Sequence, residues 1–174
     1  GGERHTVFRL GEVHGRVTAR TQEIAAMLAC VDSSTATDNL WGERWSKLVV
    51  NCMRNPVAAA TGRGGNANDS DDHTRFLAIR LAGEAIEVGM AFGFQLETVY
   101  GIAPEDILAA TKGDAAALKR CEDRLFENMK HRSDKQRPSM GQDIAKRRRT
   151  EIDFINGLVV EKATNLGLSV PANE

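Results

Sequence analysis

The apolar and polar positions of the first part of the chain predict a strand, a helix and a second strand. Residues 7–12 (VFRLGE) are rich in β-forming side chains, and residues 18–31 (TARTQEIAAMLACV) carry Ile24, Leu28 and Val31 at helical spacing. Residues 33–39 (SSTATDN) are polar and β-branched, as in an edge strand. Two strands cannot bury both faces of a sheet, so we expect residues 1–38 to be the end of a larger α/β domain.

From residue 39 to the end of the chain, the apolar residues recur at helical spacing. Residues 39–62 form the most apolar stretch, with large side chains around most of the helix circumference (Trp41, Trp45, Leu48, Val49, Cys52 and Met53). A helix that is apolar nearly all round is a central, buried one. The pattern therefore predicts a mainly α-helical second domain over residues 39–174.

Further helices are expected over residues 74–96, after Pro104, over residues 114–130 and from Ser139 to Leu166. Gly89 and Gly93 fall inside the first of these, and we expect both to allow close packing against a neighbour, because glycine otherwise weakens a helix. The segment over residues 61–75 is rich in Gly, Asn and Asp and is predicted to be a loop. It lacks the G-x-G-x-x-G spacing of a phosphate-binding turn.

Composition and charge exclude several classes of function. The sequence is 41% hydrophobic and 27% charged with a net charge of −1, so nothing global attracts it to nucleic acid or to an anionic membrane. No apolar run reaches the length of a membrane span. The three scattered cysteines indicate buried thiols in a reducing compartment, which we expect to be the cytoplasm. The four histidines show no metal-ligand spacing, so no metal site is predicted.

A local basic excess lies between residues 119 and 149, which hold eleven Lys or Arg and five Asp or Glu. A nucleic-acid surface is one interpretation, but the segment contains a single aromatic residue and no reader motif. A solvated helix face, or the wall of a pocket for an anionic cofactor or substrate, fits better.

Candidate chemistry is concentrated on the most apolar helix. Lys47, Asn51 and Asn55 stand at i, i+4 and i+8, so they form one polar stripe. The stripe could be satisfied by neighbouring helices or by solvent. It could also line a cleft, where the lysine would serve as a cation and proton donor and the amides would direct hydroxyl or carbonyl groups, since buried polar groups need partners.

A second candidate segment covers residues 137–163. Ser139 followed by Gln142 fits a capping box, which would begin a helix and leave free backbone N–H groups for a carboxylate or phosphate. Glu151 follows the basic run of residues 146–149, and the alternative is that it is only an ion-pair partner on an exposed helix. One straight helix would place Ser139 and Glu151 about 18 Å apart. We therefore expect a break near residues 147–150, capped by Thr150.

These two segments also carry a resemblance. W-x-K-L-x-x-N-x-x-x-N-P from Trp45 to Pro56, followed by S-M-x-Q-D-x-x-x-x-R-x-T-E-I-D-x-I-N-G from Ser139 to Gly157, resembles the ketopantoate reductases (2-dehydropantoate 2-reductases). The opening VFRLGE is similar to the strand that ends their nucleotide-binding domain. The resemblance implies a helical C-terminal domain of the 6-phosphogluconate-dehydrogenase-like type, preceded by a remnant of a Rossmann domain. It also implies NADPH-dependent reduction of ketopantoate to pantoate, in pantothenate biosynthesis.

The resemblance further implies roles for five residues. Lys47 matches the general acid at the substrate ketone, and Asn51 and Asn55 match asparagines that hold the hydroxyl end. Ser139 matches the serine at the substrate carboxylate. Glu151 matches a glutamate near the substrate and the nicotinamide ribose, so it is both a catalytic and a cofactor-binding candidate.

Departures from the family pattern bear on the substrate more than on the reaction class. Val57 and Ala58 follow the N-P pair where the family usually has Leu with Thr or Ser, and Pro138 replaces a common Ser. No G-x-G-x-x-G turn is present, so we expect NADPH to be bound mainly by a Rossmann domain outside this chain, and the chain alone to be inactive. The alternatives are a relative that reduces another 2-oxo acid, or a helical dimerisation module with a vestigial site; a homodimer would suit either.

Overall fold

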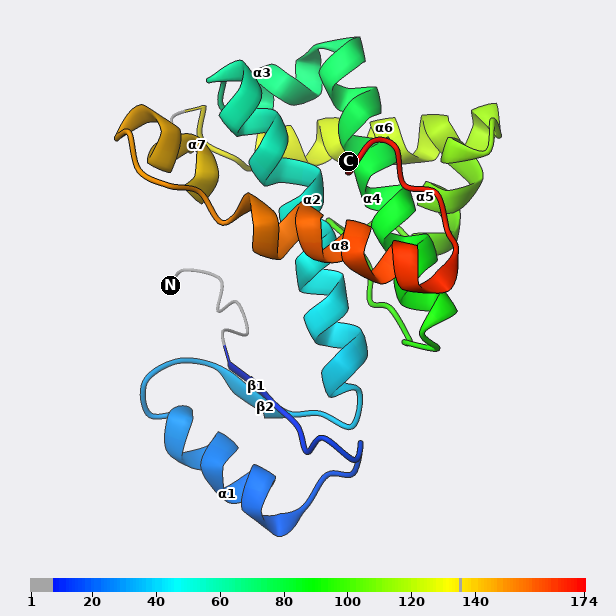
Figure 1. Cartoon of the computed structure of the whole chain (residues 1–174). Coiled ribbons are helices and arrows are strands. Elements are labelled where there is room, and N and C mark those ends of the chain that lie inside the picture. The colour runs from blue at the N-terminus through cyan, green and yellow to red at the C-terminus, as the bar shows by residue number, and fades with distance from the viewer. Residues whose placement is uncertain (1–7, 135) are drawn as a thin grey trace. The chain divides into compact units, whose positions relative to one another are not determined.

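A computed structural model describes residues 8–134 and 136–174. The chain divides into two compact units, residues 1–44 and residues 45–174, which are described separately (Figure 1). The sequence predicts a domain boundary after Asp38, and the division in the structure falls after Arg44, inside the first turns of a long helix.

The first unit is a strand–helix–strand unit in the predicted order. Strands β1 (Phe8–Leu10) and β2 (Ser34–Ala36) pair in parallel, with Phe8 opposite Ser34, and α1 (Ala19–Leu28) connects them. Helix α1 begins with a capping box in which the Thr18 side chain accepts from the Thr21 backbone N–H, and the Thr21 side chain accepts from that of Thr18. Parallel strands need such a crossover, which is why this short sequence can form a βαβ unit.

The second unit is helical, as predicted. Its helices are α2 (Leu40–Thr61, which begins in the first unit), α3 (Gly65–Ser70), α4 (Asp72–Ala91), α5 (Pro104–Thr111), α6 (Ala115–Lys130), α7 (Ser139–Ala145) and α8 (Ile152–Leu166). Helix α4 packs against α5 and α8, and α5 packs against α6. None of the helices in the described part of the chain is long and apolar enough to cross a bilayer.

The core is formed by α2, α4 and the helices that pack around them, and one of the two predicted glycine contacts is found there. Its fully buried side chains include those of α2 (Val49, Cys52 and Met53), of α4 (Ile79, Ala82, Ala85 and Ile86), and of α6 and α8 (Ala117, Cys121, Leu125, Val159 and Ala163). A Cβ at Gly89 would overlap the Trp45 ring, whose Nε1 donates to the Ala85 carbonyl at 2.8 Å. The prediction for Gly93 is wrong, because this residue follows the end of α4 at a φ of +78°, where glycine is favoured.

The segment over residues 61–75 is more ordered than its composition predicts. It contains α3, and Asp71 then caps α4 by accepting from the backbone N–H groups of His73 and Thr74 at 3.1 and 3.0 Å. The loop prediction is therefore wrong for residues 65–70 and 72–75. Asn and Asp are common at helix starts for the same reason that they are common in turns, so composition alone did not separate the two.

The predicted break in the last helical region is confirmed, but both predicted caps are wrong. Helix α7 ends at Ala145 and α8 begins at Ile152, while Arg147 between them has a φ of +55°. The N-cap of α8 is Glu151 rather than Thr150, without a side-chain cap. The N-cap of α7 is Pro138, which has no N–H to complete a capping box, and Gln142 instead donates to the Arg137 carbonyl at 3.0 Å.

Candidate active site

The polar stripe of α2 lines a cavity within the second unit. Lys47, Asn51 and Asn55 face it, because 100° per residue returns positions four apart to nearly the same side of a helix. The opposite side of α2 is anchored in the core by Val49 and Met53, which are fully buried. The cavity measures about 290 Å³, the lower end of the range for small-molecule sites.

The opposite wall of the cavity comes from segments distant in the sequence. Tyr100, Arg132 and residues 136–139 line it, and Ser139 is therefore brought to the same space as the α2 stripe. Because Pro138 occupies the N-cap, Ser139 stands at the first residue of α7 and its hydroxyl is not used as a cap. Four of the five predicted site residues thus line one cavity: Lys47, Asn51, Asn55 and Ser139.

These four side chains are available to a ligand. Among the residues that the structure describes, none of them has a hydrogen bond or an ion pair with another side chain or with the backbone. Asn55 is only 6% exposed as a whole residue. Lys47 is exposed at the mouth of the cavity. The arrangement offers a cation, two amides and a hydroxyl to one small molecule.

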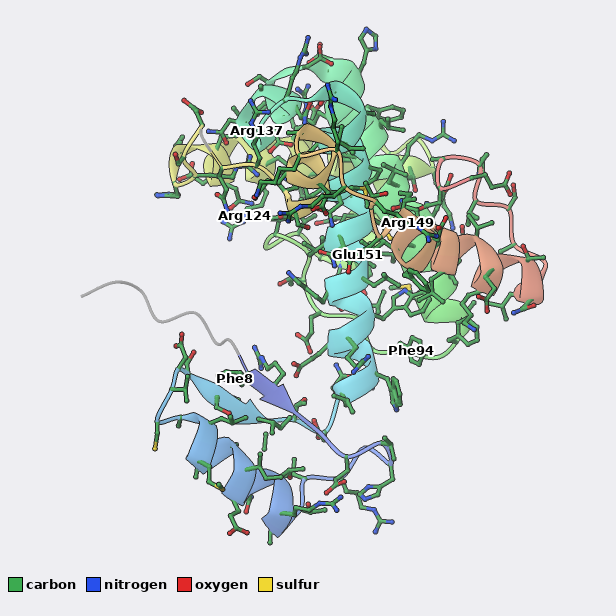
Figure 2. All side chains as sticks on the ribbon, turned by 60° about the vertical axis from the view of Figure 1, so that its left-hand side comes forward. Phe8, Phe94, Arg124, Arg137, Arg149 and Glu151 are labelled. Atoms are coloured by element: carbon green, nitrogen blue, oxygen red, sulfur yellow. The ribbon has the colours of Figure 1, made fainter. Side chains whose placement is uncertain are left out.

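Glu151 is not brought to this cavity. It stands exposed at the N-terminal end of α8, as Figure 2 shows, and it is not among the residues that line the 290 Å³ space. The break between α7 and α8 separates it from Ser139 by a turn in the chain rather than by a continuous helix.

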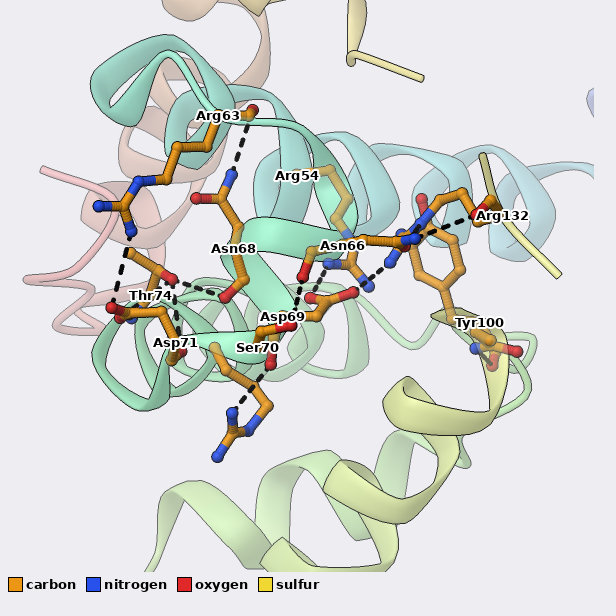
Figure 3. Close-up of polar contacts among 12 residues, drawn as sticks. Arg54, Arg63, Asn66, Asn68, Asp69, Ser70, Asp71, Thr74, Tyr100 and Arg132 are labelled. Carbon is orange, nitrogen blue, oxygen red and sulfur yellow. Dashed lines mark hydrogen bonds and ion pairs between the residues drawn. The ribbon is translucent and has the colours of Figure 1, made fainter. Parts of the chain in front are cut away.

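A buried carboxylate organises one side of the cavity (Figure 3). Asp69, on α3, is only 1% exposed and forms ion pairs with Arg54 and Arg132, the latter at 2.5 Å from Nη2 to Oδ2. Arg132 Nε also donates to Asn66 Oδ1 at 2.7 Å. The Arg54 guanidinium lies 4.5 Å from the centre of the Tyr100 ring, a cation–π distance. Asp69 therefore ties α2, α3 and the segment after α6 together behind the cavity.

The lining of the cavity is strongly cationic. Lys47, Arg54, Arg132 and Arg137 all contribute, and no Asp or Glu is among the described residues that line it. Asp69, behind the cavity, balances only one of these four charges. The lining therefore attracts an anion, because the remaining cations in a concave site concentrate the field. Sequence reasoning missed Arg54, although it stands three residues after Asn51 and so belongs to the stripe. Arg132 and Arg137 belong to the predicted basic segment, whereas nothing in the sequence pointed to Tyr100.

Comparison with known proteins decides the family. A family model described as "Ketopantoate reductase PanE/ApbA C terminal" matches residues 39–174. The chain belongs to this family. The matched range is the predicted helical domain, and it contains every residue of the cavity.

Relatives with the same domain are named as ketopantoate reductases. A 2-dehydropantoate 2-reductase from Pyrococcus horikoshii is 29% identical over 137 residues, which are 79% of this chain and 38% of that protein. The crystal structure of 2-dehydropantoate 2-reductase from Geobacter metallireducens has 30% identity and a TM-score of 0.70, covering 95% of this chain and 48% of that one.

A more distant structure shares the fold. D-mandelate dehydrogenase, in a ternary structure with NADH and anilino(oxo)acetate, has 20% identity and a TM-score of 0.72, covering 95% of this chain and 61% of that chain. This chain spans less than half the length of the Pyrococcus horikoshii and Geobacter metallireducens reductases.

Proposed function

We propose that this chain is the substrate-binding and acid-bearing half of an NADPH-dependent 2-oxo acid reductase. The observation that carries the proposal is the convergence of Lys47, Asn51, Asn55 and Ser139 in one small cationic cavity, with no hydrogen-bond partner for their side chains among residues 8–134 and 136–174. A 2-oxo acid presents a carboxylate, a ketone and a short side chain. The hydroxyl of Ser139, the ammonium of Lys47 and the amides of Asn51 and Asn55 correspond to these three features in that order.

The chemistry assigns each side chain a task. Reduction of a ketone adds a hydride to carbon and a proton to oxygen, and the Lys47 ammonium supplies that proton to the developing alkoxide. Ser139 donates to the substrate carboxylate, and Asn51 and Asn55 hold the far end of the substrate. Positioned donors of this kind stabilise charge that forms at the oxygen in the transition state. Glu151, outside the cavity, is assigned to the substrate and the nicotinamide ribose of the cofactor only through the family resemblance.

The hydride donor requires residues that this chain does not provide. When bound, NADPH supplies the hydride. A dinucleotide site of this class needs G-x-G-x-x-G between a strand and a helix, whereas the segment after β1 reads GEVHGR, with glycines only at Gly11 and Gly15. The residues present do not fit a pyrophosphate site, so we assign NADPH binding mainly to a Rossmann domain outside this chain. Ketopantoate is the substrate that the names of the relatives support.

The proposal is tested by a matched pair of variants in the protein that joins this chain to its cofactor domain. Lys47→Met keeps the stem volume but removes the acid, and turnover of ketopantoate with NADPH is expected to fall by about 100-fold or more. Lys146→Met, on the exposed run after α7, is expected to leave turnover nearly unchanged. Equal losses in the two variants, or near-normal turnover by Lys47→Met, would show that Lys47 is not the proton donor.

A dimerisation module with a vestigial site is the competing function. If the site is vestigial, the turnover of the joined protein should not change on substitution of any of the five candidate residues: Lys47→Met, Asn51→Ala, Asn55→Ala, Ser139→Ala or Glu151→Gln. A pure interaction surface also gives no reason for four unpartnered polar side chains to share one cavity.

A further inference from the structure

Arg54 extends the polar stripe of α2 beyond the four residues assigned above. It stands seven residues after Lys47, two turns or about 10 Å further along the helix axis and on nearly the same side. Its side chain is 7% exposed and lines the cavity. The cavity thus has Lys47 near one end of the stripe and a buried guanidinium near the other.

The Arg54 guanidinium is only partly satisfied by the protein. Nη1 is bonded to Asp69, whereas Nε and Nη2 are buried and have no hydrogen-bond partner among the described residues. Leaving buried donors of a charged group unpaired costs more than leaving neutral ones, so such groups point to a missing partner. Nε and one Nη form the edge of the guanidinium that binds a carboxylate in a bidentate manner.

Charge at this end of the cavity is also in excess. Asp69 is shared between two guanidiniums, Arg54 and Arg132, and Arg137 adds a third cation nearby. Ketopantoate carries one carboxylate, which Ser139 receives while Lys47 serves the ketone, and a neutral hydroxyl at its far end. A neutral hydroxyl would not balance the excess positive charge around Arg54, Arg132 and Arg137.

We propose that the site prefers a 2-oxo dicarboxylic acid to a monocarboxylic one such as ketopantoate, and that the second carboxylate binds the free edge of Arg54 beside Arg132. This inference rests on the proposed 2-oxo acid reductase function and specifies its substrate class. Tyr100 also lines the cavity, and its ring stacks over the Arg54 guanidinium. The backbone of Tyr100 has a φ of +55°. The second carboxylate reaches the buried nitrogens by displacing this ring. Tyr100 is the only tyrosine in the chain, so its ring signals report the event without ambiguity.

The test compares two probes of similar size on the 174-residue chain, 2-oxoglutarate with two carboxylates and 2-oxoisovalerate with one. Titration calorimetry is expected to give at least about 10-fold tighter binding of 2-oxoglutarate, the scale of one additional charge-assisted hydrogen bond. The NMR signals of the Tyr100 ring are expected to shift with 2-oxoglutarate and to stay in place with 2-oxoisovalerate.

Variants assign the preference to a residue. Arg54→Met leaves Asp69 paired with Arg132 and is expected to abolish the preference for 2-oxoglutarate. Arg63→Met, an exposed arginine outside the cavity, is expected to keep it. Should Arg54→Met fail to fold, the comparison of the two probes on the unaltered chain still decides.

Three outcomes would overturn the inference: equal or weaker binding of 2-oxoglutarate, an unchanged preference in a folded Arg54→Met, or a Tyr100 ring that responds to both probes alike. None of them bears on Lys47 as the acid, which the turnover of Lys47→Met decides separately.

Discussion

Replacing Asp69 by Asn tests whether one buried carboxylate holds the walls of the cavity together. Asp69 is 1% exposed, and its two oxygens pair with Arg54 and Arg132, whose side chains are 7% and 14% exposed. Removing one member of a buried ion pair costs about 3–5 kcal/mol, because the remaining charge keeps its burial without its partner. Here the loss leaves two guanidiniums uncompensated, so Asp69→Asn is expected to lower the free energy of unfolding by about 3 kcal/mol or more.

Urea denaturation followed by circular dichroism measures this change. Asp72→Asn is the matched control, because Asp72 also pairs with an arginine, Arg75 at 2.6 Å, but its side chain is 87% exposed. Exposed ion pairs contribute little, so this control should unfold close to the unaltered chain. A loss for Asp69→Asn that is no larger than the loss for Asp72→Asn would refute the reasoning, since burial would then not set the strength of the pair.

Two further predictions concern the core. Gly89→Ala places a Cβ against the Trp45 ring and is expected to lower the free energy of unfolding by about 1–3 kcal/mol. Gly157→Ala, whose Cβ has its nearest neighbour at 3.6 Å, should instead stabilise α8 by up to about 1 kcal/mol. Urea denaturation measures both changes, and a Gly89→Ala variant as stable as the unaltered chain would contradict the packing. Burial raises the pKa of Cys52 to about 12, so at pH 8 iodoacetamide should modify the exposed Cys30 in the native chain and all three cysteines only after unfolding, as mass spectrometry would detect.

The helical fold and most of the cavity follow from sequence patterns with a clear physical basis. The 3.6-residue period fixes which side of a helix a residue faces, so Lys47, Asn51 and Asn55 could be placed together before the structure was known. The same rule includes Arg54, which stands three residues after Asn51 and seven after Lys47, whereas the predicted stripe contains only residues four and eight apart. The predicted stripe therefore lacks one of the residues of α2 that line the cavity, Arg54.

Features that depend on tertiary contacts were not predictable in this way. Tyr100 and Arg132 reach the cavity from segments outside helices, where no period constrains the direction of a side chain. The capping box at Ser139 failed because Pro138 took the N-cap, and a proline cannot donate the bond that the motif requires. The break before α8 was predicted correctly, but the reason for predicting it is not supported, because Glu151 lies outside the cavity that Ser139 lines.

The claim that the α2 cavity is the 2-oxo acid site is tested most directly by mapping where ketopantoate binds on the 174-residue chain. Backbone amide signals in a ¹H–¹⁵N titration are predicted to move around Lys47, Asn51, Asn55 and Ser139, and to move far less in Lys47→Met. A larger cavity of about 480 Å³, lined by Phe126 and Met129 among others, provides the internal comparison. Shifts confined to that second cavity, or no shifts along the α2 stripe at millimolar ligand, would contradict the account.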